Sequence, residues 1–354
     1  MKMMKAMVLE EPKKFVYKDV PVPTINTDEV LIKVKFCGIC GSDWGSYNGM
    51  YEDEVACLPL ITGHEFWGVV EKVGENVTSI KAGDRVAVDI CLTCGTCYYC
   101  RRGEPLLCEE FSQIGIHVDG AFAEYVKAPA NNCYIVPDEI DDHSATFIEP
   151  LTACINASRK MNCELGASVA VIGAGLGIIH ALLAKLRGAA PVIVIDGQQK
   201  RLEMAKNMSA DMVIDFTKTP DTVAEIMKIT NGVGVDYVIE AVGSSKTYEQ
   251  AFQMIRRGGK LEAFGICSDD DFAKLPPAAF VLQEKKIAGS CAGIGHDWEV
   301  AISLLQYKRV DPCPLISMIV PLSELEEALN ELHDNKDLVK VLVCPEITER
   351  ILLI

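Results

Sequence analysis

Residues 168–186 have the sequence SVAVIGAGLGIIHALLAKL. The apolar run at its start predicts a buried β-strand, the glycines that follow predict a tight turn, and the last residues predict a helix. Three glycines, a histidine and a lysine interrupt the stretch, which argues against a membrane span. Gly173 and Gly175 match the first two glycines of a dinucleotide-binding loop, in which the backbone approaches a pyrophosphate closely.

The loop departs from that pattern at its third glycine. Ile178 stands where the third glycine is expected and Gly177 comes one residue earlier, so the loop is one residue short. By itself the stretch is also compatible with an ordinary strand–helix turn. Asp196 favours the binding interpretation, because it ends the next predicted strand, PVIVID, twenty-one residues after Gly175. A carboxylate there hydrogen-bonds a ribose 2′-hydroxyl and repels a 2′-phosphate, which predicts NAD rather than NADP.

The chain changes character on either side of this region. Between about 153 and 290, predicted strands such as DYVIEAV alternate with predicted helices such as QKRLEMAKNMSA and TYEQAFQMIRRGG, which is typical of a parallel sheet covered by helices. Residues 1–152 instead hold short β-branched segments such as WGVVEKVG and DRVAVDI. We therefore expect an α/β protein with a β-rich domain of residues 1–152, completed by 291–354, and a doubly wound domain of residues 153–290.

Composition limits the classes of function. The 354 residues carry a formal net charge of −16, and the sequence shows no basic patch of the kind that binds nucleic acid. The start, MKMMKAMVLEEPKKF, has no apolar segment followed by a cleavage site. We expect a cytoplasmic protein with no nucleic-acid or membrane partner. Fifteen cysteines, an odd number, argue against a disulfide framework in such a protein.

Residues 91–108, CLTCGTCYYCRRGEPLLC, contain five of those cysteines. Cys94, Cys97, Cys100 and Cys108 have the spacing C-x2-C-x2-C-x7-C, which brings four thiolates within reach of one ion. Four thiolates form a closed zinc site without a position for substrate. Cys91 ends the segment RVAVDI and is left out of this site. An iron–sulfur cluster or free thiols are the alternatives.

A second set of ligand-type side chains is spread over three short segments. CGICGSD contains Cys40, GHEFWG contains His64 and Glu65, and FIEPLTA contains Glu149. Each fragment alone is weak, since a single buried histidine or cysteine is usually a packing residue. Together with the cysteine-rich segment and the glycine loop, they indicate a second metal site.

These segments resemble the zinc-dependent medium-chain dehydrogenases, the superfamily of alcohol, sorbitol and threonine dehydrogenases. CGICGSD, GHEFWGVVEKVG, AGDRVAV, CGTCYYCRRGEPLLC, GAFAEYV and IEPLTA occur in that family's order and cover essentially the whole chain. The resemblance implies a GroES-like, β-rich catalytic domain and a Rossmann domain. Glu149, in IEPL, stands where alcohol dehydrogenases of the classical type carry cysteine, and it points to the polyol and threonine branch.

The resemblance also implies roles for the second set. Cys40, His64 and Glu149 surround the catalytic zinc, and Glu65 is a neighbouring carboxylate that can enter the coordination shell directly or through water. A catalytic zinc keeps one position open and acts there as a Lewis acid toward an alcohol. Ser42 takes the position of the family's hydroxyl proton relay, and Asp43 orients the imidazole of His64. A plain turn is the alternative for the GSD segment.

One departure leaves the proton route open. Many relatives carry histidine five residues after the zinc-binding cysteine, and this chain has Gly45 there. Water, or a hydroxyl of Tyr47 or Tyr51, is the available replacement. Trp44, Tyr47, Tyr51 and His296 are also the candidates for the substrate pocket.

The resemblance extends to the cofactor side. The short segments AVG, FGI and SCA match family segments that line the nicotinamide, and Arg201 matches a position near the adenosine, although a solvated helix charge is its alternative. The expected cofactor contacts are Gly173, Gly175, Leu176, Gly177, Asp196, Arg201, Val242, Phe264, Gly265, Ile266, Ser290 and Cys291.

The sequence therefore predicts an oxidoreductase with NAD and two zinc ions per chain. It would oxidise a secondary alcohol of a polyol, sugar or cyclitol reversibly to the ketone, as a homo-oligomer and most simply a tetramer. L-threonine oxidised at its hydroxyl carbon is the alternative substrate. A zinc-free reductase of the same superfamily, a zinc-dependent nucleic-acid binder and a catalytically inactive binding or structural descendant are the rival classes.

Overall fold

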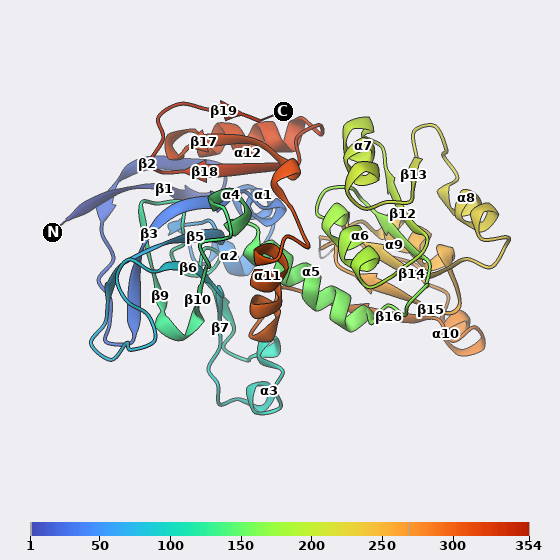
Figure 1. The fold of residues 1–354 in the computed structure, drawn as a ribbon, viewed down its shortest axis with the longest axis horizontal. Helices are drawn as coiled ribbons and strands as arrows, with labels where there is room; N and C mark the ends of the chain where they lie inside the picture. Colours follow the sequence, from blue (N-terminus) through green and yellow to red (C-terminus); the bar gives the residue numbers. More distant parts are fainter. Residues whose placement is uncertain (1, 269, 354) are drawn as a thin grey trace. The chain divides into compact units, whose positions relative to one another are not determined.

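The computed structural model describes residues 2–268 and 270–353, which divide into two compact units. One unit comprises residues 1–152 and 293–354, and the other comprises residues 153–292. Figure 1 shows both units as ribbons. None of the helices in the described ranges is long and apolar enough to cross a membrane.

The second unit is built on a parallel sheet (Figure 1). Its strands are β11 (Val169–Ile172), β12 (Val192–Asp196), β13 (Met212–Asp215), β14 (Val235–Glu240), β15 (Ile255–Ala263) and β16 (Lys286–Gly289). Among the described residues they lie in the order β13-β12-β11-β14-β15-β16, and every pairing between neighbours is parallel. The direction of strand succession reverses between β11 and β14, which is the place where doubly wound sheets bind ligands at their carboxyl ends.

Helices connect these strands and cover the sheet because their apolar faces need burial. They are α6 (Gly177–Leu186), α7 (Gln199–Met208), α8 (Thr222–Ile229), α9 (Ser245–Met254) and α10 (Pro277–Leu282). Two predicted boundaries need correction. The predicted helix TYEQAFQMIRRGG ends at Met254, and β15 begins directly at Ile255, which pairs with Val235. Two residues favour this early change from helix to strand. Ile255 is β-branched, and Gly258 has a φ of +73°, which is outside the helical region.

The first unit is β-rich, as its short β-branched segments predicted. Its strands are β1 (Met3–Glu11), β2 (Lys14–Pro21), β3 (Glu29–Gly38), β4 (Leu60–Ile61), β5 (Glu65–Val73), β6 (Arg85–Val88), β7 (Cys91–Leu92), β8 (Ser112–Gln113), β9 (Tyr125–Pro129), β10 (Cys133–Ile135), β17 (Ile316–Pro321), β18 (Lys340–Cys344) and β19 (Ile351–Leu352). The largest sheet in the described ranges runs β10-β6-β5-β3-β18-β17-β19, with β9 also paired to β3. Smaller sheets join β2-β1-β4 and β7-β8.

Short helices interrupt this unit. They are α1 (Gly41–Asn48), α2 (Glu52–Val55), α3 (Tyr98–Arg101), α4 (Asp142–Ala145), α11 (His296–Gln306) and α12 (Leu325–Asp334), with 3-10 turns at Pro105–Leu107, Ala130–Asn132, Cys313–Leu315 and Leu322–Glu324. Helix α5 (Ile148–Met161) runs across the boundary between the two units.

The C-terminal segment completes the sheet of the first unit. Strand β18 pairs antiparallel with β3, so that Leu342 lies opposite Gly38 and Val343 opposite Cys37. All five residues of β18 are buried, including Lys340 at its start. A strand from the end of the chain therefore lies directly beside the segment that leads into Cys40.

Candidate active site and metal centres

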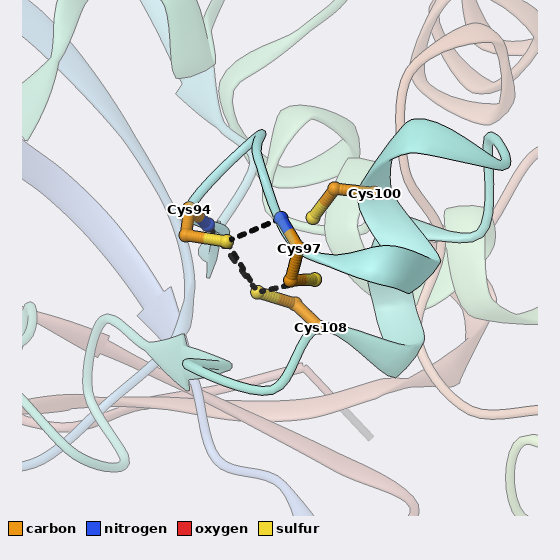
Figure 2. Close-up of side chains that lie close together, drawn as sticks. All are labelled: Cys94, Cys97, Cys100 and Cys108. Atoms are coloured by element: carbon orange, nitrogen blue, oxygen red, sulfur yellow. Dashed lines mark hydrogen bonds between the residues drawn. The ribbon is translucent and has the colours of Figure 1, made fainter.

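The four cysteines of the C-x2-C-x2-C-x7-C pattern converge. Their sulfurs all lie within 4.8 Å of one another, with Sγ–Sγ distances of 3.5 Å between Cys108 and Cys94 and 3.9 Å between Cys97 and Cys108. Figure 2 shows the four side chains pointing toward a common centre, with Cys100 coming from helix α3. Cys91 is not in this group, because it is buried in strand β7 opposite Gln113.

The backbone around the cluster is arranged for thiolates. The N–H groups of Thr96 and Cys97 donate to Cys94 Sγ over 3.5 and 3.3 Å and lower the pKa of Cys94 to about 6. The pKa of Cys97 is lowered as well, first by the N–H of Cys100. Burial, together with the neighbouring thiols, raises the pKa of Cys100 to about 12. A divalent cation removes this conflict between adjacent sulfurs, so the donor set fits a closed zinc site.

Cys40, His64 and Glu65 form the second group. Their ligand atoms lie within 4.8 Å of one another, although the residues belong to different segments. Cys40 is the N-cap residue of helix α1, where the helix N-terminus favours a negatively charged group. Glu65 is the first residue of strand β5 and His64 directly precedes it; β5 pairs with β3 so that Glu65 is opposite Gly38. Both side chains are almost fully buried.

Ser42 and Asp43 lie beside this group. The Oγ atom of Ser42 is 3.4 Å from Nε2 of His64. Asp43 Oδ2 accepts a hydrogen bond from the Cys40 N–H at 2.8 Å, which caps helix α1. Its other oxygen, Oδ1, is 3.6 Å from His64 Nδ1, slightly beyond hydrogen-bonding distance. One carboxylate thus faces both Cys40 and His64.

Glu149 lies near this group but outside it. It occupies the first turn of helix α5 and is buried. Burial raises its pKa to about 7, while the attraction of His64 partly opposes the shift. The charge of Glu149 in turn contributes to raising the pKa of His64, after the larger effect of Asp43.

Lys340 belongs to this site and was not predicted from the sequence. Its ammonium group forms a buried ion pair with Glu65 Oε2 and donates to the carbonyl of Ile39 at 3.1 Å. Burial alone would lower its pKa, but the attraction of Glu65 and Cys40 raises it above the ordinary value. Only its placement at the start of β18 could have identified it, and nothing local in VKVLVCP marks it.

The charges around the second group also fit a cation. Asp43, Glu65, Glu149 and Cys40 bring potential negative charge into a buried region, and Lys340 and a protonated His64 are the cationic groups that act on them in the described residues. A thiolate, an imidazole and carboxylates are the ligand types that zinc takes in catalytic sites. The residues present therefore fit a second zinc ion.

The glycine loop follows β11, and each glycine there has a distinct environment. A Cβ on Gly173 would lie 2.8 Å from Val242, and its φ of +97° also favours glycine. A Cβ on Gly175 would meet nothing within 4 Å, so this face of the loop is open for a ligand. A Cβ on Gly177 would lie 3.0 Å from Val171. Gly177 thus allows helix α6 to pack closely on β11, which is the role of the third fingerprint glycine.

Asp196 ties the loop to the next strand. Its Oδ2 accepts from the N–H of Ala174 at 2.7 Å, and Oδ1 accepts from Gly197 and Gln198 at 2.7 and 2.8 Å. A carboxylate oxygen can accept two hydrogen bonds. Oδ2 accepts only the one from Ala174 among these three, so it can accept a further hydrogen bond. Leu176 is the residue before helix α6, and Arg201 lies in helix α7 with Nε buried.

The remaining predicted cofactor residues gather at the carboxyl ends of the parallel strands. Val242 follows β14, whereas Phe264, Gly265 and Ile266 follow β15, and Ser290 and Cys291 follow β16. Val242, Ile266 and Cys291 are exposed, and the Oγ of Ser290 is buried without a hydrogen bond to the described residues. Phe264 packs edge-on against His180 of helix α6, with ring centroids 4.3 Å apart.

Glu262 is an unusual neighbour of this region. Its side chain is fully buried in β15, and neither carboxylate oxygen has a hydrogen-bond partner among the described residues. Burial raises its pKa to about 7, with Ser290 and the charges of Lys260 and Lys160 opposing the shift. Glu262 was not predicted from the sequence, although a glutamate inside the apolar segment GKLEAFG is a visible signal.

The substrate-pocket candidates separate into different environments. Trp44 stacks on His333 of helix α12 with ring centroids 3.7 Å apart, and Tyr47 donates to Glu326 of the same helix at 2.7 Å. Both side chains therefore have packing roles against α12. His296 is 77% exposed in its side chain and pairs with Glu299. Tyr51 is the candidate that lies against Gly45 of helix α1.

Comparison with protein families agrees with this architecture. Residues 26–138 match the alcohol dehydrogenase GroES-like domain, and residues 175–307 match the zinc-binding dehydrogenase family. The first matched range contains the cysteine cluster, and the second begins within the glycine loop, at Gly175.

Individual relatives cover nearly the whole chain. A sorbitol dehydrogenase of Bacillus subtilis (strain 168) is 34% identical over 97% of this chain and 97% of its own length. An L-threonine 3-dehydrogenase of the same strain is 33% identical over 93% of this chain and 95% of its own. A zinc-binding dehydrogenase from Sinorhizobium meliloti 1021, solved bound to NADP, has a TM-score of 0.89 at 30% identity and covers 98% of this chain and 100% of its own.

We predict that Glu262→Gln stabilises the protein only at neutral and alkaline pH. The folded state holds the pKa of Glu262 at about 7, above the ordinary value of 4.5, so the folded state favours the protonated carboxyl. The cost of ionising it grows as pH rises from 4.5 to 7 and reaches up to about 3 kcal/mol above pH 7. The amide avoids this cost, so urea unfolding should show the gain at pH 8 and less than about 1 kcal/mol at pH 5.

The exposed Glu203, in helix α7 of the same unit, gives the matched control. Glu203→Gln should leave the free energy of unfolding nearly unchanged at both pH values. An equal effect of Glu262→Gln at pH 5 and pH 8 would show that the buried carboxyl is not protonated in the folded state.

Proposed function

The chain belongs to the zinc-dependent medium-chain alcohol dehydrogenase superfamily, and on that premise we propose that it transfers hydride from a secondary alcohol of a polyol, sugar or cyclitol to NAD. The reaction is reversible and gives the ketone. Residues 1–152 and 291–354 form the catalytic domain in this proposal, and residues 153–290 form the NAD-binding domain.

One observation carries the proposal. Ligand atoms of Cys40, His64 and Glu65 lie within 4.8 Å of one another, and the hydroxyl of Ser42 lies 3.4 Å from His64 Nε2. A metal-binding group with a proton-accepting hydroxyl beside it is what the oxidation of an alcohol requires. An inactive descendant would have no need to keep both.

The chain's own residues have separate roles in the proposed reaction. Bound zinc would act as a Lewis acid toward the alcohol, and bound NAD would accept the hydride. Cys40, His64 and Glu65, whose ligand atoms converge, would hold the catalytic zinc, with the nearby Glu149 as a further carboxylate ligand. Cys94, Cys97, Cys100 and Cys108 would hold a second zinc that supports the fold. Ser42 takes the hydroxyl proton, and Asp43 keeps His64 and the N-terminus of helix α1 aligned.

The proposal of NAD rests on Asp196. A ribose 2′-hydroxyl can donate to the remaining lone pair of Oδ2, whereas a 2′-phosphate would meet the carboxylate charge. The relative from Sinorhizobium meliloti was solved with NADP, so cofactor choice is a property to test in this chain.

The first test is the oxidation of a substrate panel. Polyols, cyclitols, sugar phosphates and L-threonine are offered with NAD, and NADH formation is followed by absorbance. Turnover of polyols or cyclitols above L-threonine supports the proposal, and the reverse order supports the threonine alternative suggested by the second relative. No turnover with any of these alcohols would support the inactive descendant.

We predict two zinc ions per chain with different consequences of ligand loss. Cys40→Ser should remove one zinc and abolish NADH formation while the protein stays folded. Cys97→Ser should remove the other zinc and lower the melting temperature, because the closed site contributes folding free energy. Elemental analysis, activity and thermal unfolding of both variants check this.

Cys133, which lies in β10 outside both groups, supplies the control. Cys133→Ser should retain two zinc ions and full activity. A wild-type protein with one zinc or none after careful metallation would contradict the assignment.

We predict that Asp196→Ala reduces NAD preference. The substitution removes the acceptor for the ribose hydroxyl and the repulsion of a 2′-phosphate, so kcat/KM for NAD should fall and the gap to NADP should narrow. The substitution should also destabilise the loop, because the Asp196 carboxylate accepts hydrogen bonds from three backbone N–H groups. Asp196→Asn keeps an acceptor without the charge and separates the two effects. A wild-type enzyme with higher kcat/KM for NADP would overturn the proposal.

We further propose that the chain forms a homo-oligomer, most simply a tetramer, through strand β16. Within the described residues β16 pairs with β15 alone, which leaves its other edge open. Ile287 of this strand and Val281 and Leu282 of helix α10 are exposed, with Leu282 at 80%. An open edge next to exposed apolar side chains is favourable for pairing with a second copy.

We predict that Ile287→Lys combined with Leu282→Asp shifts the protein to a smaller species. The two charges would have to be buried at the pairing edge, which costs association free energy. Sedimentation velocity at micromolar concentration measures the change. Leu165→Lys replaces a residue that is 88% exposed elsewhere on the same unit and should leave the wild-type oligomer intact. A stable wild-type monomer would end the proposal.

A further inference from the structure

The face of helix α1 that carries Ser42 continues over Gly45 and Ser46. Residues three and four positions apart lie on the same side of a helix, with Cβ atoms about 5–6 Å apart. Helix α1 ends in a C-cap at Gly49, where the N–H groups of Gly49 and Met50 bond the carbonyls of Ser46 and Gly45 at 3.1 and 3.0 Å. Helix α2 then begins at residue 52.

Tyr51 occupies the space above Gly45. A Cβ on Gly45 would lie 2.8 Å from both Cζ and Oη of the tyrosine, and still closer to Cε2. No side chain larger than hydrogen fits at position 45 while the ring stays there. The phenol hydroxyl therefore lies over Gly45, which is three residues after Ser42 on the same face of helix α1.

Glu54 contacts the next residue of the same face. Its Oε2 is hydrogen-bonded to Ser46 Oγ, which also lies 3.1 Å from the carbonyl of Ser42. Tyr51 and Glu54 are themselves one turn apart, since the N–H of Val55 bonds the Tyr51 carbonyl at 3.0 Å. The tyrosine and the carboxyl therefore lie over neighbouring positions of helix α1.

The bonding of Ser46 suits both protonation states of Glu54. A hydroxyl has one hydrogen to donate and two lone pairs. When Glu54 is ionised, Ser46 can donate to it. When Glu54 is protonated, it can donate to Ser46 Oγ, and Ser46 can turn its hydrogen to the Ser42 carbonyl. The carboxyl can thus gain or lose a proton without leaving a buried polar group unsatisfied.

We propose that Tyr51 and Glu54 carry the proton released at Ser42 to solvent, an inference that rests on the proposed alcohol oxidation. Bound NAD would accept the hydride, and the alcohol proton passes to Ser42 Oγ while the hydroxyl proton of Ser42 passes to Tyr51 Oη. The proton of Tyr51 then passes to the Glu54 carboxylate, which becomes the carboxylic acid. Ketone reduction returns the same proton in the opposite direction.

The surroundings of Glu54 favour its protonated form. Burial raises its pKa above the ordinary value, and the hydrogen bond from Ser46 partly opposes the shift. The titratable groups facing it are Asp53 in its own turn, His117 after strand β8, and Asp43 in α1. The two aspartates raise the pKa of Glu54 further, and His117 lowers it. Glu54 is only half-buried, so it can exchange the proton with water.

The test measures NADH formation in a single turnover of zinc-loaded enzyme across pH. Glu54→Gln should lower the rate of alcohol oxidation about ten- to a hundredfold near neutral pH, at the lower end of what general bases contribute because water can partly replace the carboxylate. The loss should shrink at high pH and on addition of small buffer bases, while KM changes little. Glu54→Asp should recover part of the rate.

Tyr51→Phe and the double variant test the order of the relay. Tyr51→Phe keeps the ring over Gly45 and removes only the hydroxyl. Its rate of alcohol oxidation should therefore fall by about the same factor as that of Glu54→Gln. The double variant should be no slower than either single variant, because both act in one series of transfers. Asp53→Asn is the matched control, since this exposed carboxyl adjoins Glu54 but carries no proton in the relay. Its rate near neutral pH should equal the wild type's, and its pH profile should move only slightly to lower pH, because the charge of Asp53 raises the pKa of Glu54.

A second readout is independent of turnover. The NMR resonance of the Glu54 carboxyl carbon can be assigned by its loss in Glu54→Gln. Its titration midpoint should lie above the ordinary range of a glutamate, and this midpoint should shift in Ser46→Ala. Zinc content, melting temperature and NADH binding should stay at wild-type values in Tyr51→Phe and Glu54→Gln. Wild-type single-turnover rates and pH profiles in both variants would overturn the relay and leave the proposed function standing. A wild type that oxidises no alcohol would remove both.

Discussion

The buried ion pair between Glu65 and Lys340 is the interaction on which the catalytic unit depends. It joins residues 275 positions apart and lies beside Cys40 and His64. A buried carboxylate without a partner is costly, and breaking a buried pair typically costs 3–5 kcal/mol. The pairing of β18 with β3 brings Lys340 to Glu65 and offsets the cost of the buried carboxylate beside the candidate metal ligands, which ties the C-terminal segment to the first unit.

The same pair shows how far sequence reasoning extends. Local patterns predicted the two classes of unit, the cysteine group and the segment containing Cys40, because spacing and strand–helix alternation are short-range signals. They could not find Lys340, since its role arises from the pairing of distant strands. Gly38 gives a partial hint, because a Cβ there would approach Glu65 and lie 3.4 Å from Lys340. Such a steric requirement becomes visible only when the partners are known.

The glycine loop after β11 illustrates the opposite case, in which the sequence departs from the expected pattern and the structure keeps the close helix–strand packing that the pattern provides. Ile178 breaks the expected glycine pattern, yet Gly177 makes the close approach to Val171 that the pattern requires. The loop is one residue shorter than the expected pattern, so the packing glycine comes one residue earlier, and a Cβ on Gly175 would meet nothing within 4 Å. Counting residues from the first glycine failed here because the physical requirement is contact between helix α6 and strand β11, not a fixed number of residues.

Helix α1 concentrates several of these requirements in eight residues. Its N-cap is a metal-ligand candidate, and Asp43 caps it with one oxygen while the other faces His64. The spacing C-x-x-D therefore couples the orientation of Cys40 to that of a histidine in another segment. Because Gly45 must remain small for Tyr51 to pack, the helix gives up about 1 kcal/mol of intrinsic stability relative to alanine. Capping at its start and hydrogen bonds from the following segment hold this short helix in place, so the positions of Ser42 and Tyr51 depend on tertiary contacts that no local helix propensity could have predicted.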